Sequence, residues 1–271
     1  MPAAQTRVRG RLLSGAVCLL TAFAALAAKA PGDGQTEQPA PGQPVKPPIR
    51  QVGPHLYQVG TVTLDAEKRT VRCRGRVNMD RSGPIELLAC TAEGKVHESV
   101  FVIEAKPLDL QVALLLLDLK DGRNPAVNHQ EDDPDRLRPP GAETSIYVEW
   151  RAAPAGEGQE PELRRERAER FLYHLQKKAP EDDARWAFLG SRLVGVRLGA
   201  DLEGSVITTF HDPLAILELA LPTANDDVYY YVNEKLCPPV GTPVELVIEA
   251  PPLPDKAAAA GDTAAEGHKA D

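Results

Sequence analysis

The chain lacks the short motifs that mark several common catalytic and metal-binding classes. Its four cysteines include no CxxC pair, which excludes the thioredoxin and zinc-ribbon signatures. No serine lies in a GxSxG motif, and no segment matches GxxxxGK[ST] or GxGxxG. The pair His97 and Glu98 is followed by Phe101 at the position where an HExxH zinc motif requires histidine. No period of about 20–50 residues repeats, so a solenoid or a propeller is also excluded.

The chain also lacks an excess of positive charge. Lysine and arginine total 31 against 39 acidic residues, for a formal net charge of -8. Cleavage after Ala27 would remove three arginines and no acid, which changes -8 by three charges to -11. An acidic chain repels phosphate backbones and anionic lipid heads, so we expect neither a nucleic-acid partner nor a membrane-surface partner.

The N-terminal segment is typical of a secretory signal peptide. It carries Arg7, Arg9, Arg11 and Lys29 but no acid, and it contains the apolar run LLSGAVCLLTAFAALAA followed by small residues. We predict a signal peptide over residues 1–28 and export to the periplasm, the cell envelope or the extracellular space. The alternative is an uncleaved anchor, but the apolar run is shorter than the ~20 residues of a spanning helix. We therefore expect no integral membrane span after processing.

Composition divides the remainder of the chain into three parts. Residues 29–50 are rich in proline, glycine and glutamine, which predicts a flexible linker. Residues 251–271 are equally low in complexity and predict a disordered tail. Residues 51–250 are long enough to bury a core and predict one domain.

Hydrophobic periodicity predicts an α+β fold for this domain, built on a largely antiparallel sheet of hairpins with two or three helices. We expect one hairpin over 60–78 and a second in which 85–91 pairs with 95–104. We expect a buried helix over 106–122, a strand over 144–150 and a charged helix over 161–178. Four further strands are expected within 185–196, 204–210, 227–233 and 242–249, with a short helix or turn over 211–221.

Three cysteines remain after the predicted cleavage, and they allow two interpretations. An exported protein favours one disulfide and one spare thiol, and Cys73 with Cys90 is the pair to test because both lie on strands predicted to be neighbours. The alternative is three buried thiols, including Cys237, that pack as small hydrophobic side chains.

The polar residues inside the apolar strand segments are the candidates for a site. On a strand His97 and Glu98 would point to opposite faces. The expected hairpin register places Glu86 and Glu98 on one face, where His211 and Asp212 could complete an acid–base group or a metal site. The catalytic candidates are therefore His97, Glu98, His211 and Asp212, and the metal candidates are Glu86, Glu98, His211 and Asp212. The competing interpretation is that these polar residues are structural and satisfied within the sheet.

Five separated blocks resemble one known family. These are PIELLACTAEGKVHESVFV with ALLLLDL, then VEW, WAFLGSR, ADLEGSVITTFHDPLAIL, and VNEKLCPPVGTPVELVI. Together they are similar to the YdjY-domain proteins, which are exported bacterial proteins. The resemblance supplies no catalytic residues to carry over. Ferredoxin-like labels attached to relatives do not fit this chain, because three scattered cysteines cannot supply the four thiolates of an ordinary iron–sulfur cluster.

Three functional hypotheses follow. The first is an exported, non-catalytic binding module for a protein partner or an envelope component, with no cofactor. The second is a metal-assisted hydrolase that uses the histidine and carboxylate candidates. The third is a structural envelope protein.

Overall fold

The computed structural model describes residues 47–122, 141–154, 156, 158 and 160–253. The signal peptide, the tail beyond residue 253 and most of the linker predicted above lie outside these residues. Among the described residues, no helix has the length and apolar character that a membrane crossing requires.

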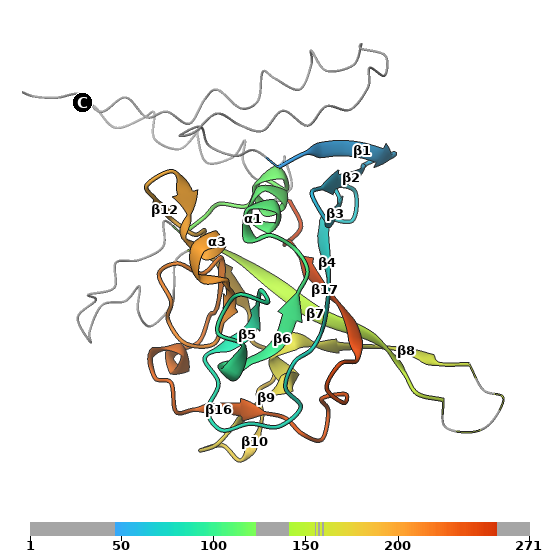
Figure 1. Ribbon diagram of the computed structural model, residues 1–271, viewed down its shortest axis with the longest axis vertical. Coiled ribbons are helices and arrows are strands. Elements are labelled where there is room, and N and C mark those ends of the chain that lie inside the picture. Colours follow the sequence, from blue (N-terminus) through green and yellow to red (C-terminus); the bar gives the residue numbers. More distant parts are fainter. Residues whose placement is uncertain (1–46, 123–140, 155, 157, 159, 254–271) are drawn as a thin grey trace, which may run out of the picture. The chain divides into compact units, whose positions relative to one another are not determined.

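The described chain is mostly β-structure, and eight of its strands close into a barrel (Figure 1). In order around the barrel they are β4 (Thr70–Val77), β17 (Pro243–Glu249), β7 (Ala142–Ala152), β11 (Trp186–Phe188), β15 (Leu217–Leu219), β14 (Ser205–Thr208), β5 (Leu87–Cys90) and β6 (Ser99–Ile103). The pairing of β6 with β4 closes the ring. Within this ring β5–β6 and β14–β15 are parallel, and the other neighbours are antiparallel.

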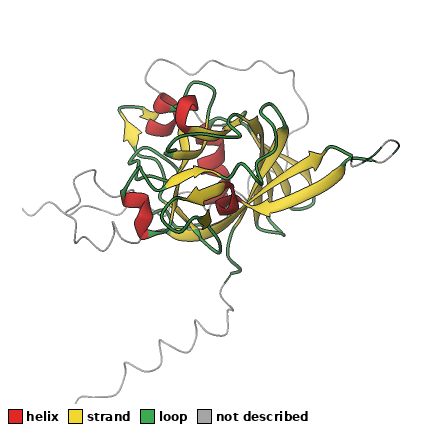
Figure 2. Ribbon diagram, turned by 90° about the horizontal axis from the view of Figure 1, so that it is seen from below, coloured by secondary structure: helices red, strands yellow, loops and turns green. Residues whose placement is uncertain are grey.

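The remaining strands extend or flank the barrel. β1 (Ile49–Gly53), β2 (Leu56–Val59) and β3 (Val62–Asp65) continue the sheet outward from β4, and β8 (Glu162–Arg167) pairs with β7. The far ends of β7 and β8 extend as a two-stranded arm (Figures 1 and 2). β9 (Leu172–His174), β10 (Ala179–Pro180) and β16 (Tyr230–Val232) form a small sheet, and β12 (Leu193–Val194) with β13 (Arg197–Leu198) forms a separate hairpin.

The described residues contain two α-helices, α1 (Pro107–Leu116) and α3 (Gly199–Glu203), and three 3-10 helices, η1 (Val96–Glu98), η2 (Ala168–Phe171) and η3 (Pro222–Asn225). Pro107 occupies the first turn of α1, where its missing N–H costs nothing. The predictions of a buried helix here and of the β3–β4 hairpin are confirmed.

Alternation along the strands builds the core. On β7 the side chains of Ile146, Val148 and Trp150 are buried, while Tyr147 and Glu149 face outward as predicted. Trp150 and Phe101 both meet the ring of Phe171 edge-on, with centroids 5.8 and 5.3 Å apart. This aromatic group fixes the packing inside the barrel.

The predicted α+β fold of hairpins is wrong. The protein is a closed barrel that depends on pairing between distant parts of the chain, such as β4 with β17 and β5 with β14. The predicted 85–91 hairpin is also wrong, because β5 and β6 run parallel with Leu87 opposite Ser99. After Cys90 the chain does not fold back. Instead Thr91 donates its backbone N–H to Gly204, 2.9 Å away, and the chain then coils through η1 to start β6.

The predicted charged helix over 161–178 is wrong for a similar reason. Its first part forms β8, which hydrogen-bonds to β7 and continues into η2 and β9. The Arg165 guanidinium lies 4.0 Å from the centre of the Tyr147 ring. In the β7–β8 ladder Arg165 lies opposite Glu149, so its guanidinium reaches the Tyr147 ring diagonally. These contacts with a neighbouring strand decide the conformation.

Of the two interpretations of the cysteines, the structure agrees with unpaired thiols and lacks the Cys73–Cys90 disulfide. All three described cysteines are free thiols. β6 lies between β4 and β5, so the two strands are not neighbours. Cys73 packs in the main core, and Cys90 packs in a separate cluster with Leu87 and Val102.

Candidate functional site

A pocket of about 320 Å³ lies against the side of the barrel where β5 pairs with β14. We call it the β5–β14 pocket. Its wall includes Leu87 from β5, Thr208 from β14, and six ionisable side chains: Glu86, Lys95, Arg192, Glu203, His211 and Asp212. These side chains come from five separate places in the chain, so the pocket is a product of the fold.

A backbone contact brings two of these segments together. Gly204 ends α3 in the left-handed conformation, and a Cβ built on Gly94 would lie 2.8 Å from the carbonyl oxygen of Gly204. Only glycine allows so close an approach of two backbones. Lys95 and Glu203 are the immediate neighbours of these glycines, so the contact sets both side chains at the pocket.

Lys95 is held by two carboxylates. Its Nζ lies 2.8 Å from Oε2 of Glu86 and 3.3 Å from Oε1 of Glu98. These two acids raise the pKa of the Lys95 ammonium, against the opposing effect of its partial burial. Lys95 therefore remains charged, and it ties η1 to the residue that precedes β5.

His211 is oriented by a buried acid. Its Nδ1 lies 2.8 Å from Oε2 of Glu218, whose side chain is 2 % exposed. Burial raises the pKa of the Glu218 carboxyl, while the bond from His211 opposes this rise. The neighbouring Asp212 accepts the backbone N–H of Leu214 at 2.8 Å, which restrains its carboxylate at the pocket wall.

The structure brings together some of the residues expected from the sequence. Glu86, His211 and Asp212 all line the pocket, although the hairpin used to connect them does not exist. Glu98 supports the site through Lys95. The side chain of His97 is 78 % exposed, and its Nε2 lies 3.9 Å from Oε2 of Glu98.

The expectation that His97 and Glu98 serve opposite faces of a strand is wrong. Both residues lie in the 3-10 helix η1, because the chain must turn there to start a strand parallel to β5. No group of three or more histidine, cysteine, aspartate or glutamate side chains in the described part of the chain is arranged to hold a metal ion.

Sequence reasoning missed Lys95, Arg192, Glu203 and Glu218. Glu218 had a usable signal, because it is the one charged residue in the apolar run LAILELAL. A lone carboxylate in a buried strand requires a partner. Nothing in the local sequence places Arg192 or Glu203 near β5, because that proximity depends on the contact between Gly94 and Gly204.

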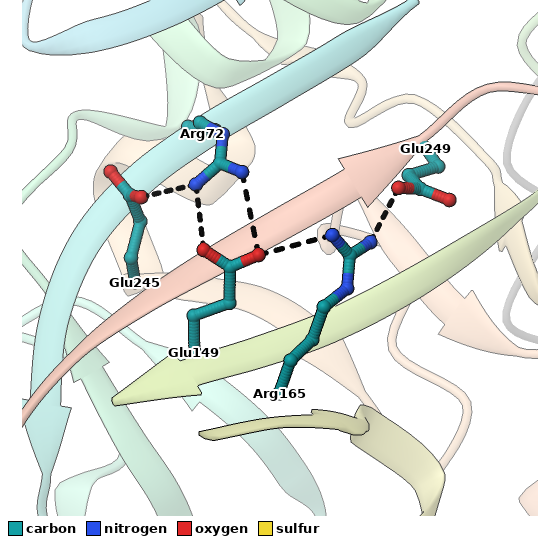
Figure 3. Close-up of polar contacts among 5 residues, drawn as sticks. All are labelled: Arg72, Glu149, Arg165, Glu245 and Glu249. Carbon is teal, nitrogen blue, oxygen red and sulfur yellow. Dashed lines mark hydrogen bonds and ion pairs between the residues drawn. The ribbon is translucent and has the colours of Figure 1, made fainter. Parts of the chain in front are cut away.

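A second group of charges lies on the outer face of the sheet (Figure 3). Glu149 accepts hydrogen bonds from Arg72 at 2.9 Å and from Arg165 at 3.1 Å, and these arginines also bind Glu245 and Glu249. Each arginine in this group is already paired with two acids. These cross-strand ion pairs link β4, β17, β7 and β8, so a structural role in the sheet accounts for them without a ligand.

The comparisons with known proteins support one assignment. Neither the curated proteins nor the solved structures give a significant match. The family model described as "YdjY domain" matches residues 62–249, which run from β3 to β17 and include all eight strands of the barrel. The chain therefore belongs to the YdjY-domain family.

Proposed function

We propose that this protein is an exported, non-catalytic binding module that takes a cationic group of a protein partner or an envelope component into the β5–β14 pocket. The observation that carries the proposal is the convergence of acidic side chains on this pocket. Glu86, Glu203 and Asp212 line it together with Lys95, Arg192 and the imidazole of His211. Lys95 is already shared by Glu86 and Glu98, and His211 is already paired with Glu218.

Electrostatics favour a cation over an anion. The acids that line or support the pocket outnumber the bases, and the whole chain carries a formal charge of -8. A cleft with one dominant sign of charge raises the local concentration of ligands of the opposite sign. An ammonium or guanidinium group would therefore be attracted from solution and paired in the pocket.

The polar groups are also organised before a ligand arrives. Glu86 is fixed by Lys95, Asp212 by the backbone of Leu214, and His211 by Glu218. Side chains that are already immobile lose little entropy on binding. The hydroxyl of Thr208 donates its hydrogen bond to the backbone carbonyl of Leu217 at 3.3 Å. Because this hydroxyl is bonded to the sheet and not to a base, the pocket favours binding over nucleophilic catalysis.

The test is a titration of ¹⁵N-labelled protein with N-acetyl-lysine methylamide, followed by two-dimensional NMR. We expect the amide signals of the segments around Glu86, Lys95 and Asp212 to shift. The Asp212→Asn variant keeps the acceptor oxygen for Leu214 but loses the charge, and we expect it to weaken binding about tenfold. N-acetyl-glutamate methylamide should not bind.

A matched control is Glu162→Gln, which removes an exposed acid from β8 and should leave the affinity unchanged. The proposal fails if the glutamate compound binds as well as the lysine compound, or if the pocket amides do not respond. It also fails if Glu162→Gln weakens binding as much as Asp212→Asn does.

Export has a separate test. The basic start, apolar run and small residues of the N-terminal segment support it. Edman sequencing of protein recovered from the periplasm or the medium should find a new N-terminus between Ala28 and Pro31. Recovery only from the cytoplasm with Arg7 still present would contradict this part of the proposal.

The second candidate function is a metal-assisted hydrolase. The observation in its favour is the bond from His211 to a buried carboxylate, which resembles the way metal-ligating histidines are oriented. Titration of the protein with Zn²⁺ by calorimetry separates the two. Tight zinc binding that is lost in His211→Ala would support the hydrolase, whereas lysine binding without zinc binding supports the binding module.

A further inference from the structure

The hairpin formed by β12 and β13 exposes an unusual number of aliphatic side chains. Leu193 is 67 % exposed, Val194 is 46 % exposed and Val196 is 57 % exposed. The turn between the strands contains Gly195 at φ +63°, a conformation that suits glycine. Neither strand pairs with a third strand among the described residues. Clustered exposed aliphatic residues mark interaction surfaces.

This hairpin is attached directly to the β5–β14 pocket. Arg192, which lines the pocket, immediately precedes β12, and α3 immediately follows β13 and ends at the pocket residue Glu203. Leu202 of α3 adds a fourth exposed aliphatic side chain, at 43 %. In Figure 1 the β12 hairpin and α3 lie side by side, as their adjacency in the chain requires. The aliphatic surface therefore borders the acidic pocket.

The base of the hairpin is firmly held. Gly199 donates its N–H to the carbonyl of Arg192 at 2.8 Å, and Ala200 donates to the hydroxyl of Ser191 at 2.9 Å. The backbone N–H of Ser191 in turn binds the side chain of Gln111 on α1 at 2.8 Å. These hydrogen bonds hold the two ends of the hairpin in place, so the position of its aliphatic tip is set by the fold.

We propose that the hairpin and the pocket form one interface, which binds a polypeptide segment of a partner protein in which a lysine or arginine adjoins aliphatic residues. This inference rests on the proposed function of the pocket. The cationic side chain would enter the acidic pocket, and the aliphatic neighbours would cover Leu193, Val194 and Val196. β12 and β13 pair with no third strand among the described residues, so an extended backbone could add beside them, which favours a polypeptide occupant.

Charge argues against the other occupants of this surface. Arg192 and Arg197 of the hairpin would attract anionic lipids, but Glu203 and Asp212 of the pocket and the formal charge of -8 on the whole chain oppose a membrane with anionic lipids. A second copy of the chain carries the same formal charge of -8 and the same acidic pocket. In a segment of a different protein, a cationic side chain complements the acids of the pocket and aliphatic side chains complement Leu193, Val194 and Val196.

The experiment compares three acetylated and amidated peptides: Lys-Val-Leu-Val, Lys-Gly-Ser-Gly and Glu-Val-Leu-Val. Affinities are measured by calorimetry, and the contact surface is mapped by NMR. We expect the first peptide to bind at least about tenfold more tightly than the second, because it buries aliphatic surface as well as charge. Amides of both the pocket and the hairpin should shift. The glutamate peptide should not bind.

Two variants locate the aliphatic contribution. Replacement of two exposed side chains, Leu193→Ser with Val196→Ser, should reduce the affinity of Lys-Val-Leu-Val to that of Lys-Gly-Ser-Gly and leave the latter unchanged. The matched control is Val240→Ser, which removes an equally exposed aliphatic residue from the loop before β17. It should alter neither affinity.

The outcomes distinguish the inference from the proposed function. If both lysine peptides bind equally and the hairpin amides do not move, the inference fails and the pocket proposal stands. If no lysine compound binds, both fail. If Glu-Val-Leu-Val binds as tightly as Lys-Val-Leu-Val, the hairpin binds aliphatic peptides without the pocket, and the inference of one joint interface fails. Binding to phosphatidylglycerol vesicles in flotation would overturn the inference in favour of a membrane if the Leu193→Ser, Val196→Ser double variant abolished it. Self-association in sedimentation that the same double variant abolished would overturn it in favour of a second copy.

Discussion

Oε2 of Glu218 lies 2.8 Å from Nδ1 of His211, and this bond joins the buried strand β15 to the wall of the pocket. The Glu218 side chain is 2 % exposed, so its charge depends on the imidazole for compensation. The bond also fixes the ring orientation of His211. The pocket therefore depends on a residue that no ligand would touch.

We predict that Glu218→Leu destabilises the fold by about 3 kcal/mol, because it leaves Nδ1 of His211 without its carboxylate partner. Glu218→Gln retains an oxygen acceptor at nearly the same position, so its cost should be about 1 kcal/mol. Urea denaturation measures both values. A Glu218→Leu protein as stable as the parent would show that the bond does not support the structure.

Closure of the barrel depends on Gly75. This residue lies on β4 opposite Ile103 of β6, and a Cβ added to it would lie 2.6 Å from the carbonyl oxygen of Val102. The neighbour is backbone, so it cannot move without breaking the β4–β6 pairing. We predict that Gly75→Ala lowers the free energy of unfolding by more than about 3 kcal/mol. Chemical denaturation followed by tryptophan fluorescence provides the measurement.

Gly83→Ala is the matched control for Gly75→Ala. A Cβ at Gly83 meets nothing within 4 Å, so the change in stability should be within about 1 kcal/mol. Equal effects of the two substitutions would mean that the backbone approach at the β4–β6 seam does not limit the residue type.

The outer charge cluster should contribute measurably to stability through Glu149. Its side chain is 12 % exposed and is bonded by both Arg72 and Arg165 (Figure 3). Glu149→Ala would remove the acid that Arg72 of β4 and Arg165 of β8 share, and we expect a loss of about 1–2 kcal/mol. The loss should shrink in high salt, which screens these ion pairs. Urea titrations at low and high salt would measure it.

Glu162 provides the comparison for Glu149. Its side chain is 70 % exposed and pairs with Arg164 at 3.4 Å, so Glu162→Ala should change stability by less than about 0.5 kcal/mol. If the two alanine variants are equally stable, the Glu149 cluster behaves as an ordinary surface ion pair and the prediction is wrong.

Local sequence was sufficient wherever the deciding contacts were local. The β3–β4 hairpin, helix α1 and the two faces of β7 all follow from periodicity within one segment. The closed barrel could not be predicted in this way, because β4 pairs with β17 and β5 with β14, each more than a hundred residues away. The parallel arrangement of β5 and β6 has the same cause, since Gly204 diverts the chain after Cys90.

The sequence predicted some residues of the candidate site, but the hairpin used to bring them together does not exist. Polar residues in apolar strands drew attention to Glu86 and His211, which do share a pocket. Their meeting does not depend on a β5–β6 hairpin. It depends on β14, whose end leads to His211, pairing with β5, which Glu86 precedes. A sequence can indicate which residues require partners, but the partner is set by the topology.

His174 should make stability depend on pH. The residue is 3 % exposed and lies between the rings of Tyr229 and Tyr230, with centroids 5.3 and 5.4 Å away. Burial lowers the pKa of His174, Lys177 lowers it further, and Glu181 opposes them. The folded pKa is therefore below the unfolded value of about 6.5. The unfolded chain binds more protons between these two values, so stability is complete above about pH 6.5 and falls as the pH drops through the folded pKa.

We predict that His174→Phe, which keeps an aromatic ring beside the tyrosines but cannot take up a proton, flattens the loss of stability between about pH 7 and 5. Urea denaturation at intervals across this range gives the slope of the unfolding free energy. His97→Gln is the control, because that side chain is 78 % exposed and its removal should leave the slope unchanged. The prediction is contradicted if the His174→Phe protein keeps the parental slope, since the proton uptake would then belong to other groups.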